Sequence, residues 1–181
     1  MFSLLAEADI NLRMVNIGGG FPAQYRGEVS PIANYAAAVT TALTRHFGNH
    51  LPEVIVEPGR SLVGDAGVIQ SEVVLISDKG DGDGKRWVYL DVGKFNGLAE
   101  TMDESIKYRI ETPGRNGPSA PVVIAGPTCD SADILYEKTQ YKMPLSLSVG
   151  DKVEIVSTGA YTASYASVGF NGFAPIRTYC I

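Results

Sequence analysis

Two short strings in the first third of the chain contain residue types that bind anionic ligands. Gly18–Gly20 directly follows the apolar run Met14–Ile17. Glycines after a strand let backbone N–H groups crowd around a phosphate, although a plain tight turn has the same composition. Glu57–Arg60 (Glu-Pro-Gly-Arg) follows a second apolar run, Val54–Val56. At the end of a barrel strand, an acid and an arginine could hold two ends of one ligand, or they could form a surface salt bridge.

The second half of the chain has two further candidate motifs. Gly126–Asp130 (Gly-Pro-Thr-Cys-Asp) follows an apolar strand, and its Cys129-Asp130 pair could act as an acid. The alternative is a buried, inert cysteine. Tyr161 lies in a Gly-Ala-Tyr string that reads equally well as a core tyrosine, and Gly169–Phe173 reads as a turn with packed aromatic residues.

The elements that position the first two motifs form a strand–helix–strand unit. Met14–Ile17 and Val54–Val56 are predicted buried strands, and Ile32–Phe47 is a predicted helix because it is rich in alanine and lacks glycine and proline. Ser30-Pro31 predicts an N-cap followed by proline at the first helical position, and Gly48 predicts the helix end. Such a unit is typical of parallel sheets and barrels.

The pattern changes near residue 67. Four strands are predicted, with a hairpin loop over 78–85 and a further loop over 113–121. The strands cover 68–77, 86–92, 121–125 and 153–157. We therefore expect residues 1–66 to be the end of an α/β domain and residues 67–181 to be a mostly-β domain. A single βα unit cannot bury both faces of a sheet, which predicts that sequence is missing from the first domain.

The composition excludes several classes of protein. The 181 residues are 45% hydrophobic with a net charge of −5, and no basic stripe is present, which argues against nucleic-acid binding. Cys129 and Cys180 are too few for a disulfide framework. No run of 18 apolar residues and no signal peptide is evident, so we expect a cytoplasmic protein that does not span a membrane. No metal site is predicted.

The order of the motifs resembles the ornithine/diaminopimelate/arginine decarboxylase family. This family uses pyridoxal 5'-phosphate (PLP) and has an alanine-racemase-like fold, a TIM-type β/α barrel followed by a β-domain. The resemblance covers about 15–173 and is carried by five strings: Gly-Gly-Gly-Phe-Pro (18–22), Glu-Pro-Gly-Arg (57–60), Gly-Pro-Thr-Cys-Asp (126–130), Gly-Ala-Tyr (159–161) and Phe-Asn-Gly-Phe (170–173). It implies an α/β plus β fold, in which residues 1–66 are the C-terminal part of the β/α barrel and residues 67–181 are the C-terminal β-domain, a barrel or a sandwich.

The resemblance also implies roles for cofactor-binding residues. Gly18, Gly19 and Gly20 would hold the PLP phosphate through backbone N–H groups, with Arg60 (preceded by Gly59) and Tyr161 at or near the same phosphate. Glu57 would meet the pyridine nitrogen and keep it protonated, because an opposite charge favours the cationic form. The protonated ring is the electron sink for loss of CO2.

Substrate-side roles are implied for the later motifs. Cys129 would reach into the partner subunit's site of a homodimer and govern where the proton goes after CO2 is lost. Asp130 would face the distal ammonium of the substrate, with Gly172 and Phe173 nearby.

One family feature is missing. The cofactor lysine of the family lies early in the barrel, in a motif like Ala-Val-Lys-Ala-Asn, and none of the seven lysines (79, 85, 94, 107, 138, 142 and 152) ends a barrel strand. We therefore expect the chain to be the C-terminal portion of an enzyme whose N-terminal half, with that lysine, lies on other sequence, and to be inactive alone.

The predicted substrate is a basic amino acid, with ornithine first and lysine next. Diaminopimelate enzymes typically have Cys-Glu where this chain has Cys129-Asp130, and an arginine-rich segment after the Asp-x-Gly loop. Here residues 91–104 hold four acids and no arginine. Glu100, or alternatively Asp103, is the predicted second acid for a distal ammonium, whereas Glu104 reads as part of a solvated face. The alternatives are a lysine/ornithine or diaminopimelate decarboxylase, and a non-catalytic homologue that binds decarboxylase subunits.

Overall fold

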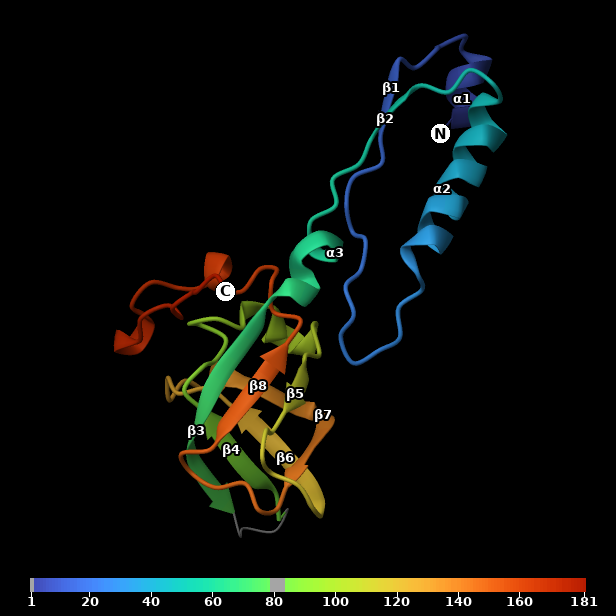
Figure 1. Cartoon of the computed structure of the whole chain (residues 1–181). Helices are drawn as coiled ribbons and strands as arrows, with labels where there is room; N and C mark the ends of the chain where they lie inside the picture. The colour runs from blue at the N-terminus through green and yellow to red at the C-terminus, as the bar shows by residue number, and fades with distance from the viewer. Residues whose placement is uncertain (1, 79–83) are drawn as a thin grey trace.

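The N-terminal part of the chain forms an extended arm in the computed structural model, which describes residues 2–78 and 84–181. The short helix α1 (Phe2–Glu7) precedes strand β1 (Met14–Asn16), helix α2 (Ile32–Phe47) and strand β2 (Glu53–Ile55). β1 and β2 pair in parallel, with Val15 opposite Val54. The predicted strand–helix–strand unit is therefore present, and Figure 1 shows it projecting away from the rest of the molecule.

Two local predictions for this arm are wrong. Val15 is the one buried residue of β1, and every residue of β2 is exposed, because two strands and one helix leave the apolar side chains of the pair uncovered. The helix begins at Ile32, so Pro31 itself occupies the N-cap position and no side chain caps the helix. The end is as predicted: Gly48 has a positive φ of 57°, and its N–H donates to the Thr44 carbonyl at 2.9 Å.

A six-stranded mixed sheet forms the second part of the molecule. Its strand order is β5-β8-β3-β4-β6-β7, and all neighbours are antiparallel except β4 and β6. The strands are β3 (Val68–Asp78), β4 (Arg86–Leu90), β5 (Arg109–Glu111), β6 (Ser119–Ala125), β7 (Ile134–Pro144) and β8 (Lys152–Val156). In the described residues the edge strands β5 and β7 do not pair with each other, so the curled sheet does not close into a barrel.

Four of these strands were predicted and two were not. The predicted hairpin of β3 and β4 is present, whereas most of its loop, residues 79–83, lies outside the described residues. Strand β7 was missed because its centre, Glu137–Gln140, is polar: it is an edge strand that keeps these residues at the surface and buries its two ends. The predicted loop over 113–121 ends earlier, since β6 begins at Ser119.

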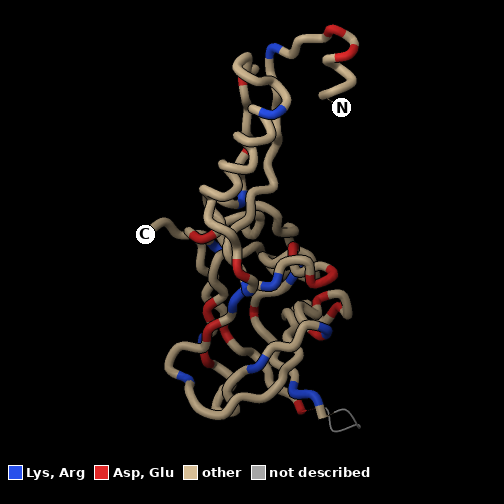
Figure 2. Tube along the Cα trace, turned by 90° about the vertical axis from the view of Figure 1, so that its right-hand side faces the viewer, with Lys and Arg blue, Asp and Glu red and all other residues tan. Residues whose placement is uncertain are grey.

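The hydrophobic core lies within this sheet. Its largest fully buried side chains come from β3, β4, β6, β7 and β8 and from the segment between β4 and β5: Val73, Val88, Leu90, Val92, Leu98, Tyr108, Ile124, Leu135, Tyr136, Met143, Val153 and Ile155. Acidic and basic residues are interspersed along the chain trace (Figure 2). None of the described helices is long and apolar enough to cross a membrane.

Close backbone contacts join the arm to the sheet. Helix α3 (Arg60–Val63) and a 3-10 turn (Gly64–Ala66) lead into β3, and the Gly159 N–H donates to the Gly64 carbonyl at 2.9 Å. A Cβ atom on Gly159 would overlap the Val63 carbonyl oxygen, so only glycine permits this approach. The segment after β8 is thereby held against α3, which places Tyr161 beside Arg60.

Candidate active site

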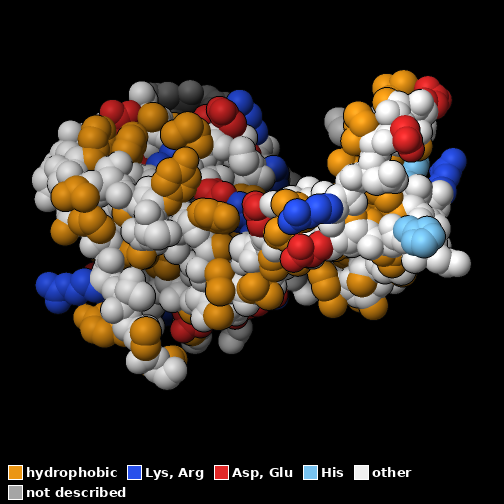
Figure 3. Space-filling view, turned by 90° about the horizontal axis from the view of Figure 1, so that it is seen from above, with side chains coloured by type: hydrophobic (Ala, Val, Ile, Leu, Met, Phe, Trp, Pro, Cys, Tyr) orange, Lys and Arg blue, Asp and Glu red, His pale blue; other side chains and the backbone are white. Residues whose placement is uncertain are grey.

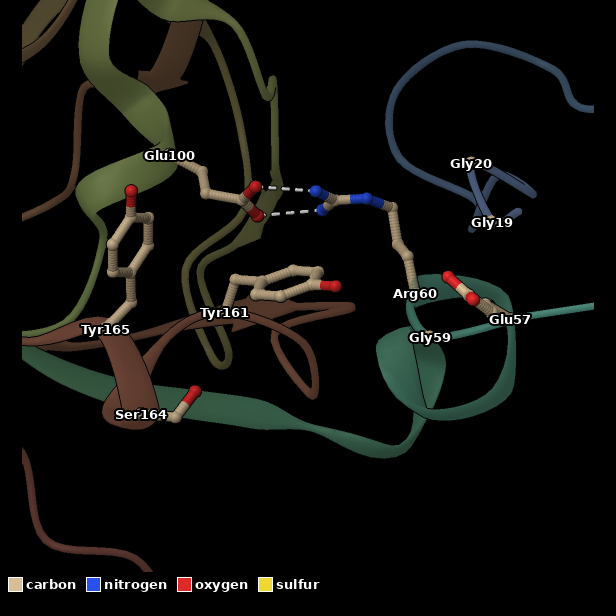
Figure 4. Close-up of a pocket in the computed structure, with 9 residues that line it drawn as sticks. All are labelled: Gly19, Gly20, Glu57, Gly59, Arg60, Glu100, Tyr161, Ser164 and Tyr165. Carbon is tan, nitrogen blue, oxygen red and sulfur yellow. Dashed lines mark hydrogen bonds and ion pairs between the residues drawn. The ribbon is translucent and has the colours of Figure 1, made fainter.

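One cavity gathers most of the predicted cofactor-binding residues. It has a volume of about 790 Å³ and lies where the arm meets the sheet domain. Three parts of the chain line it: the glycine loop and α3 region of the arm, the turn that follows β4, and the segment after β8 (Figure 4). The lining residues are Gly19, Gly20, Glu57, Gly59, Arg60, Glu100, Tyr161, Ser164 and Tyr165.

The glycine loop is tied directly to Glu57. Asn16, the last residue of β1, accepts from the Gly18 N–H at 2.8 Å, and its amide donates to the Glu57 carboxylate at 2.6 Å. The Glu57 N–H donates to the Gly18 carbonyl at 2.9 Å. A Cβ atom on Gly19 would lie 2.5 Å from the Glu57 carbonyl oxygen, so this contact requires glycine. The loop after β1 and the loop after β2 therefore meet at one wall of the cavity.

Arg60 crosses the cavity and forms a bidentate ion pair with Glu100. The two N···O distances are 2.7 and 2.5 Å, and Arg60 also donates to the Tyr25 hydroxyl at 2.7 Å. The hydrogen bonds that Arg60 donates to Glu100 are the main reason that the pKa of Arg60 rises further above its usual value. Burial raises the pKa of Tyr25, so this phenol stays a neutral hydrogen-bonding group. The guanidinium is thus a fixed positive charge with part of its donor capacity unused.

Tyr161 is a cavity residue and not a core tyrosine. It is 47% exposed, and the Arg60 guanidinium carbon lies 5.0 Å from the centre of its ring. Its backbone has a positive φ of 55°, which is uncommon for a tyrosine. A Cβ atom on Gly59 would lie 3.1 Å from the Tyr161 hydroxyl oxygen, so the absence of a side chain there makes room for the phenol.

The remaining predicted residues do not line this cavity. Cys129 and Asp130 lie on the loop after β6: Cys129 is exposed, so the alternative of a buried cysteine is wrong, and the Asp130 carboxylate accepts from the Ala132 N–H at 2.8 Å. Asp103 is exposed, and Phe173 is 37% exposed beyond the 3-10 turn Phe170–Gly172. Gly18 has a positive φ of 71° and is bonded to Asn16, but it does not line the cavity.

Three residues of the site were missed from the sequence. Ser164 and Tyr165 line the cavity and stand only three and four positions after Tyr161, so that shared string was the available signal. Tyr25 orients Arg60 from an irregular loop, 35 residues away in the sequence, and no sequence signal identifies it.

Glu104 does not have the role predicted for it, that of an acid on a solvated face. Its carboxylate accepts three backbone N–H groups of β7, from Glu137, Lys138 and Thr139, at 2.7–2.8 Å. Desolvation alone would raise the pKa of Glu104, but the hydrogen bonds from Thr139 and the β7 backbone lower it to about 2. The residue therefore fastens the turn that carries Glu100 to strand β7.

Comparisons with known proteins identify the family. Residues 11–159 match the model of the pyridoxal-dependent decarboxylase, C-terminal sheet domain. The chain is 36% identical over 169 residues to a diaminopimelate decarboxylase of Staphylococcus aureus, and 30% identical over 175 residues to a lysine/ornithine decarboxylase of Selenomonas ruminantium. A solved structure of SrLDC in complex with PLP and cadaverine has a TM-score of 0.77 at 31% identity and covers 96% of this chain.

The chain therefore belongs to the pyridoxal-dependent decarboxylase family, and the resemblance of its motifs is confirmed. Members of the family are PLP-dependent amino acid decarboxylases. The two alignments include 90% and 96% of this chain, but only 39% and 42% of the relatives' lengths. The match to the solved structure covers 44% of that chain. This chain therefore spans less than half the length of the relatives it matches.

The residues of the cavity fit the family's cofactor. PLP has a phosphate at one end and a pyridine nitrogen in its ring, so it needs donors for an anion and an acceptor for an N–H group. The glycine loop and Arg60 supply the first, and the Glu57 carboxylate supplies the second within the same cavity. Among the described residues no group of His, Cys, Asp and Glu could hold a metal ion.

Proposed function

We propose that this chain is the C-terminal portion of a PLP-dependent decarboxylase that acts on a basic amino acid, lysine or ornithine. One observation carries this proposal: Glu57, Arg60, Glu100 and Tyr161, which come from three separate segments, line a single cavity. The family supports the cofactor and the reaction class, and the residues of the cavity support the substrate class.

The lining residues would hold different parts of the cofactor. Gly19 and Gly20 with Arg60 would bind the phosphate, and Tyr161 would stand beside it. Glu57 would accept a hydrogen bond from the protonated pyridine nitrogen, and Asn16 keeps its carboxylate oriented through the 2.6 Å bond. Bound PLP supplies the electron sink for loss of CO2. Arg60 can reach a phosphate through the donors that Glu100 and Tyr25 leave unused.

The charge of the cavity favours a substrate with a distal ammonium. Glu100 lines it and Arg60 is the only basic side chain of the described lining, already paired with Glu100. A second substrate carboxylate, as in diaminopimelate, would lie close to Glu100 without a free cation of its own, and an unpaired charge in a partly dry site is strongly unfavourable. Ornithine and lysine differ by one methylene, and the preference for ornithine stays a prediction.

The exposed apolar surface of the arm supports the proposal that the chain is part of a larger enzyme. No residue of α2 is buried, and large hydrophobic side chains of the arm are exposed, among them Leu4, Ile32, Leu51 and Val54 (Figure 3). We infer that the remainder of a β/α barrel covers this surface and supplies the cofactor lysine. The division into a barrel part (1–66) and a β-domain (67–181) is part of the same proposal.

The working form is proposed to be a homodimer with shared sites. Cys129 and Asp130 do not line the cavity of their own chain, and the Cys129 thiol is exposed. Both facts suit a loop that contributes to the site of a second subunit.

Diaminopimelate is the second candidate substrate, and the 36% identity to the staphylococcal diaminopimelate decarboxylase favours it. The experiment compares kcat/KM of the complete enzyme containing this chain for lysine, ornithine and meso-diaminopimelate, with release of CO2 as the readout. We expect lysine or ornithine to exceed diaminopimelate by at least about 10-fold. Equal or better use of diaminopimelate would overturn the substrate assignment, and no release of CO2 from any of the three would overturn the function, in favour of a non-catalytic homologue.

The origin of the cofactor lysine is tested with the 181-residue chain alone. No lysine lines the cavity in the described residues. The chain mixed with PLP and reduced with borohydride should carry no label concentrated on one lysine, as read by peptide mass spectrometry. A single, stoichiometrically labelled lysine would show that this chain holds the cofactor lysine itself.

A further inference from the structure

One buried carboxylate lies outside the cavity lining and outside the residues considered so far. Asp133 is 1% exposed and ends the 3-10 turn Ser131–Asp133. It accepts from the Lys94 N–H at 2.7 Å with one oxygen, and from the Thr128 N–H at 3.2 Å and hydroxyl at 2.7 Å with the other. In the described part of the chain it forms no ion pair, so these donors must offset the cost of burying its charge.

Two glycines make the space for this carboxylate. A Cβ atom on Gly93 would overlap one side of the Asp133 carboxylate, and a Cβ atom on Gly126 would overlap the other. Gly93 belongs to the Asp-x-Gly loop after β4, and Gly126 opens the Gly-Pro-Thr-Cys-Asp loop after β6. Asp133 is therefore clamped between two loops that are 33 residues apart in the sequence.

Both loops lead directly to candidate functional residues. The Asp-x-Gly loop is closed by Asn96, whose side chain accepts from the Gly93 N–H at 2.7 Å, and it continues into the turn that presents Glu100 to Arg60. The other loop leads to Cys129, whose φ of 58° is an unusual conformation that its surroundings must hold in place.

Thr128 connects Asp133 to Cys129. Its N–H and hydroxyl donate to Asp133, and its carbonyl accepts from the Asn171 side chain at 3.0 Å. The residue before Cys129 is thus held on both sides, and a carboxylate suits this place because both of its oxygens accept. An asparagine would turn an NH2 group toward at least one backbone N–H.

We propose that Asp133 is a positioning residue that sets the place of the Cys129 loop relative to the Asp-x-Gly loop and Glu100. It touches neither substrate nor cofactor and acts through Thr128 and Lys94. The inference rests on the proposed function for its catalytic consequence, whereas the effect on Cys129 itself does not depend on that function.

The test compares Asp133→Asn with the parent protein in a Cys180→Ser background, so that Cys129 is the only thiol of this chain's sequence. The first readout is the second-order rate of Cys129 alkylation by iodoacetamide as a function of pH, followed by mass spectrometry of the Cys129 peptide. We expect the rate at pH 7 to change by at least about 3-fold. The second readout is the kcat and KM of the complete enzyme, where a displaced loop should lower kcat by about 10–100-fold and change KM less.

A matched control is Asp151→Asn. Asp151 lies at the turn between β7 and β8. It also accepts from a backbone N–H, that of Ser148 at 2.7 Å, and it pairs with Arg115. This variant should lose stability without altering Cys129 alkylation or kcat.

If Asp133→Asn does not fold, Thr128→Val and Thr128→Ser replace it. The valine variant should alter the rate of Cys129 alkylation, and the serine variant, which keeps the hydroxyl, should have the rate of the parent protein.

A folded Asp133→Asn protein with unchanged Cys129 alkylation and unchanged kcat would overturn the proposal. The same holds if Thr128→Val and Thr128→Ser behave alike. If the parent enzyme decarboxylates no basic amino acid but Cys129 alkylation still changes in Asp133→Asn, the proposed function fails and the positioning role stands.

Discussion

Replacing Glu104 with glutamine should destabilise the sheet domain, and the loss should depend on pH. The carboxylate of Glu104 accepts three consecutive backbone N–H groups of edge strand β7. Glutamine is close in shape but has one acceptor oxygen, and its NH2 group would face a backbone donor. The variant therefore removes the charge and at least one hydrogen bond while leaving the packing almost unchanged.

The magnitude follows from the pKa of Glu104, which the fold lowers from 4.5 to about 2. If the group were fully shielded, this difference would correspond to about 3 kcal/mol at neutral pH, since a tenfold change in proton affinity is about 1.4 kcal/mol. Glu104 is partly exposed, and solvent screening reduces the value, so we expect a loss of about 1–2 kcal/mol. Because the pKa is lower in the folded state, the stabilisation is fully present above pH 4.5 and disappears as the pH falls toward 2.

Urea unfolding of the chain measures this effect. Trp87 on β4 is the only tryptophan of the sequence, so its fluorescence reports the unfolding of the sheet. The free energy of unfolding of Glu104→Gln should be lower than that of the parent chain at pH 7, and the difference should shrink steadily as the pH falls from 4.5 toward 2. Glu111→Gln on β5 is the control, because in the described residues this exposed side chain forms no hydrogen bond or ion pair. A constant difference from pH 7 to pH 3, or an equal loss in the control, would refute the reasoning.

Three further predictions concern the site and its surroundings. In the complete enzyme, Glu57→Gln should lower turnover by about 10²–10³-fold and leave PLP bound, since one electrostatic partner of the reaction is lost; near-normal turnover would count against the role of Glu57. Tyr108→Phe should leave the urea midpoint unchanged or raise it, because the buried Tyr108 hydroxyl has no hydrogen-bond partner among the described residues, and a clear destabilisation would show that it has one in solution. Mixing Cys129→Ala enzyme with a variant of the cofactor lysine should restore part of the activity through mixed dimers with one intact site, and no recovery after subunit exchange would argue that each site is built within one chain.

Many of the helices, strands and site residues of this protein could be predicted from local sequence patterns. The period and composition of the sequence predicted the body and the C-terminal end of helix α2, the βα unit and four of the six sheet strands, because these elements have strong local signals. The order of short motifs predicted the decarboxylase family and its cofactor. Seven of the predicted site residues line one cavity, and these motifs could be recognised because glycine, proline and charged residues stand at strand ends, where the chain must turn.

Tertiary contacts decided what local patterns could not. The edge strand β7 is polar at its centre and became a strand only by pairing with β6. Glu104 and Asp133 look like surface acids in the sequence, but backbone donors from distant segments make them structural carboxylates. Likewise the sequence predicted that Glu100 binds a substrate, but it did not predict that Glu100 pairs with Arg60, 40 residues away, because only the fold brings the two side chains together. Hydrogen bonds and burial depend on what lies across space, and a linear pattern of residue types does not encode that partner.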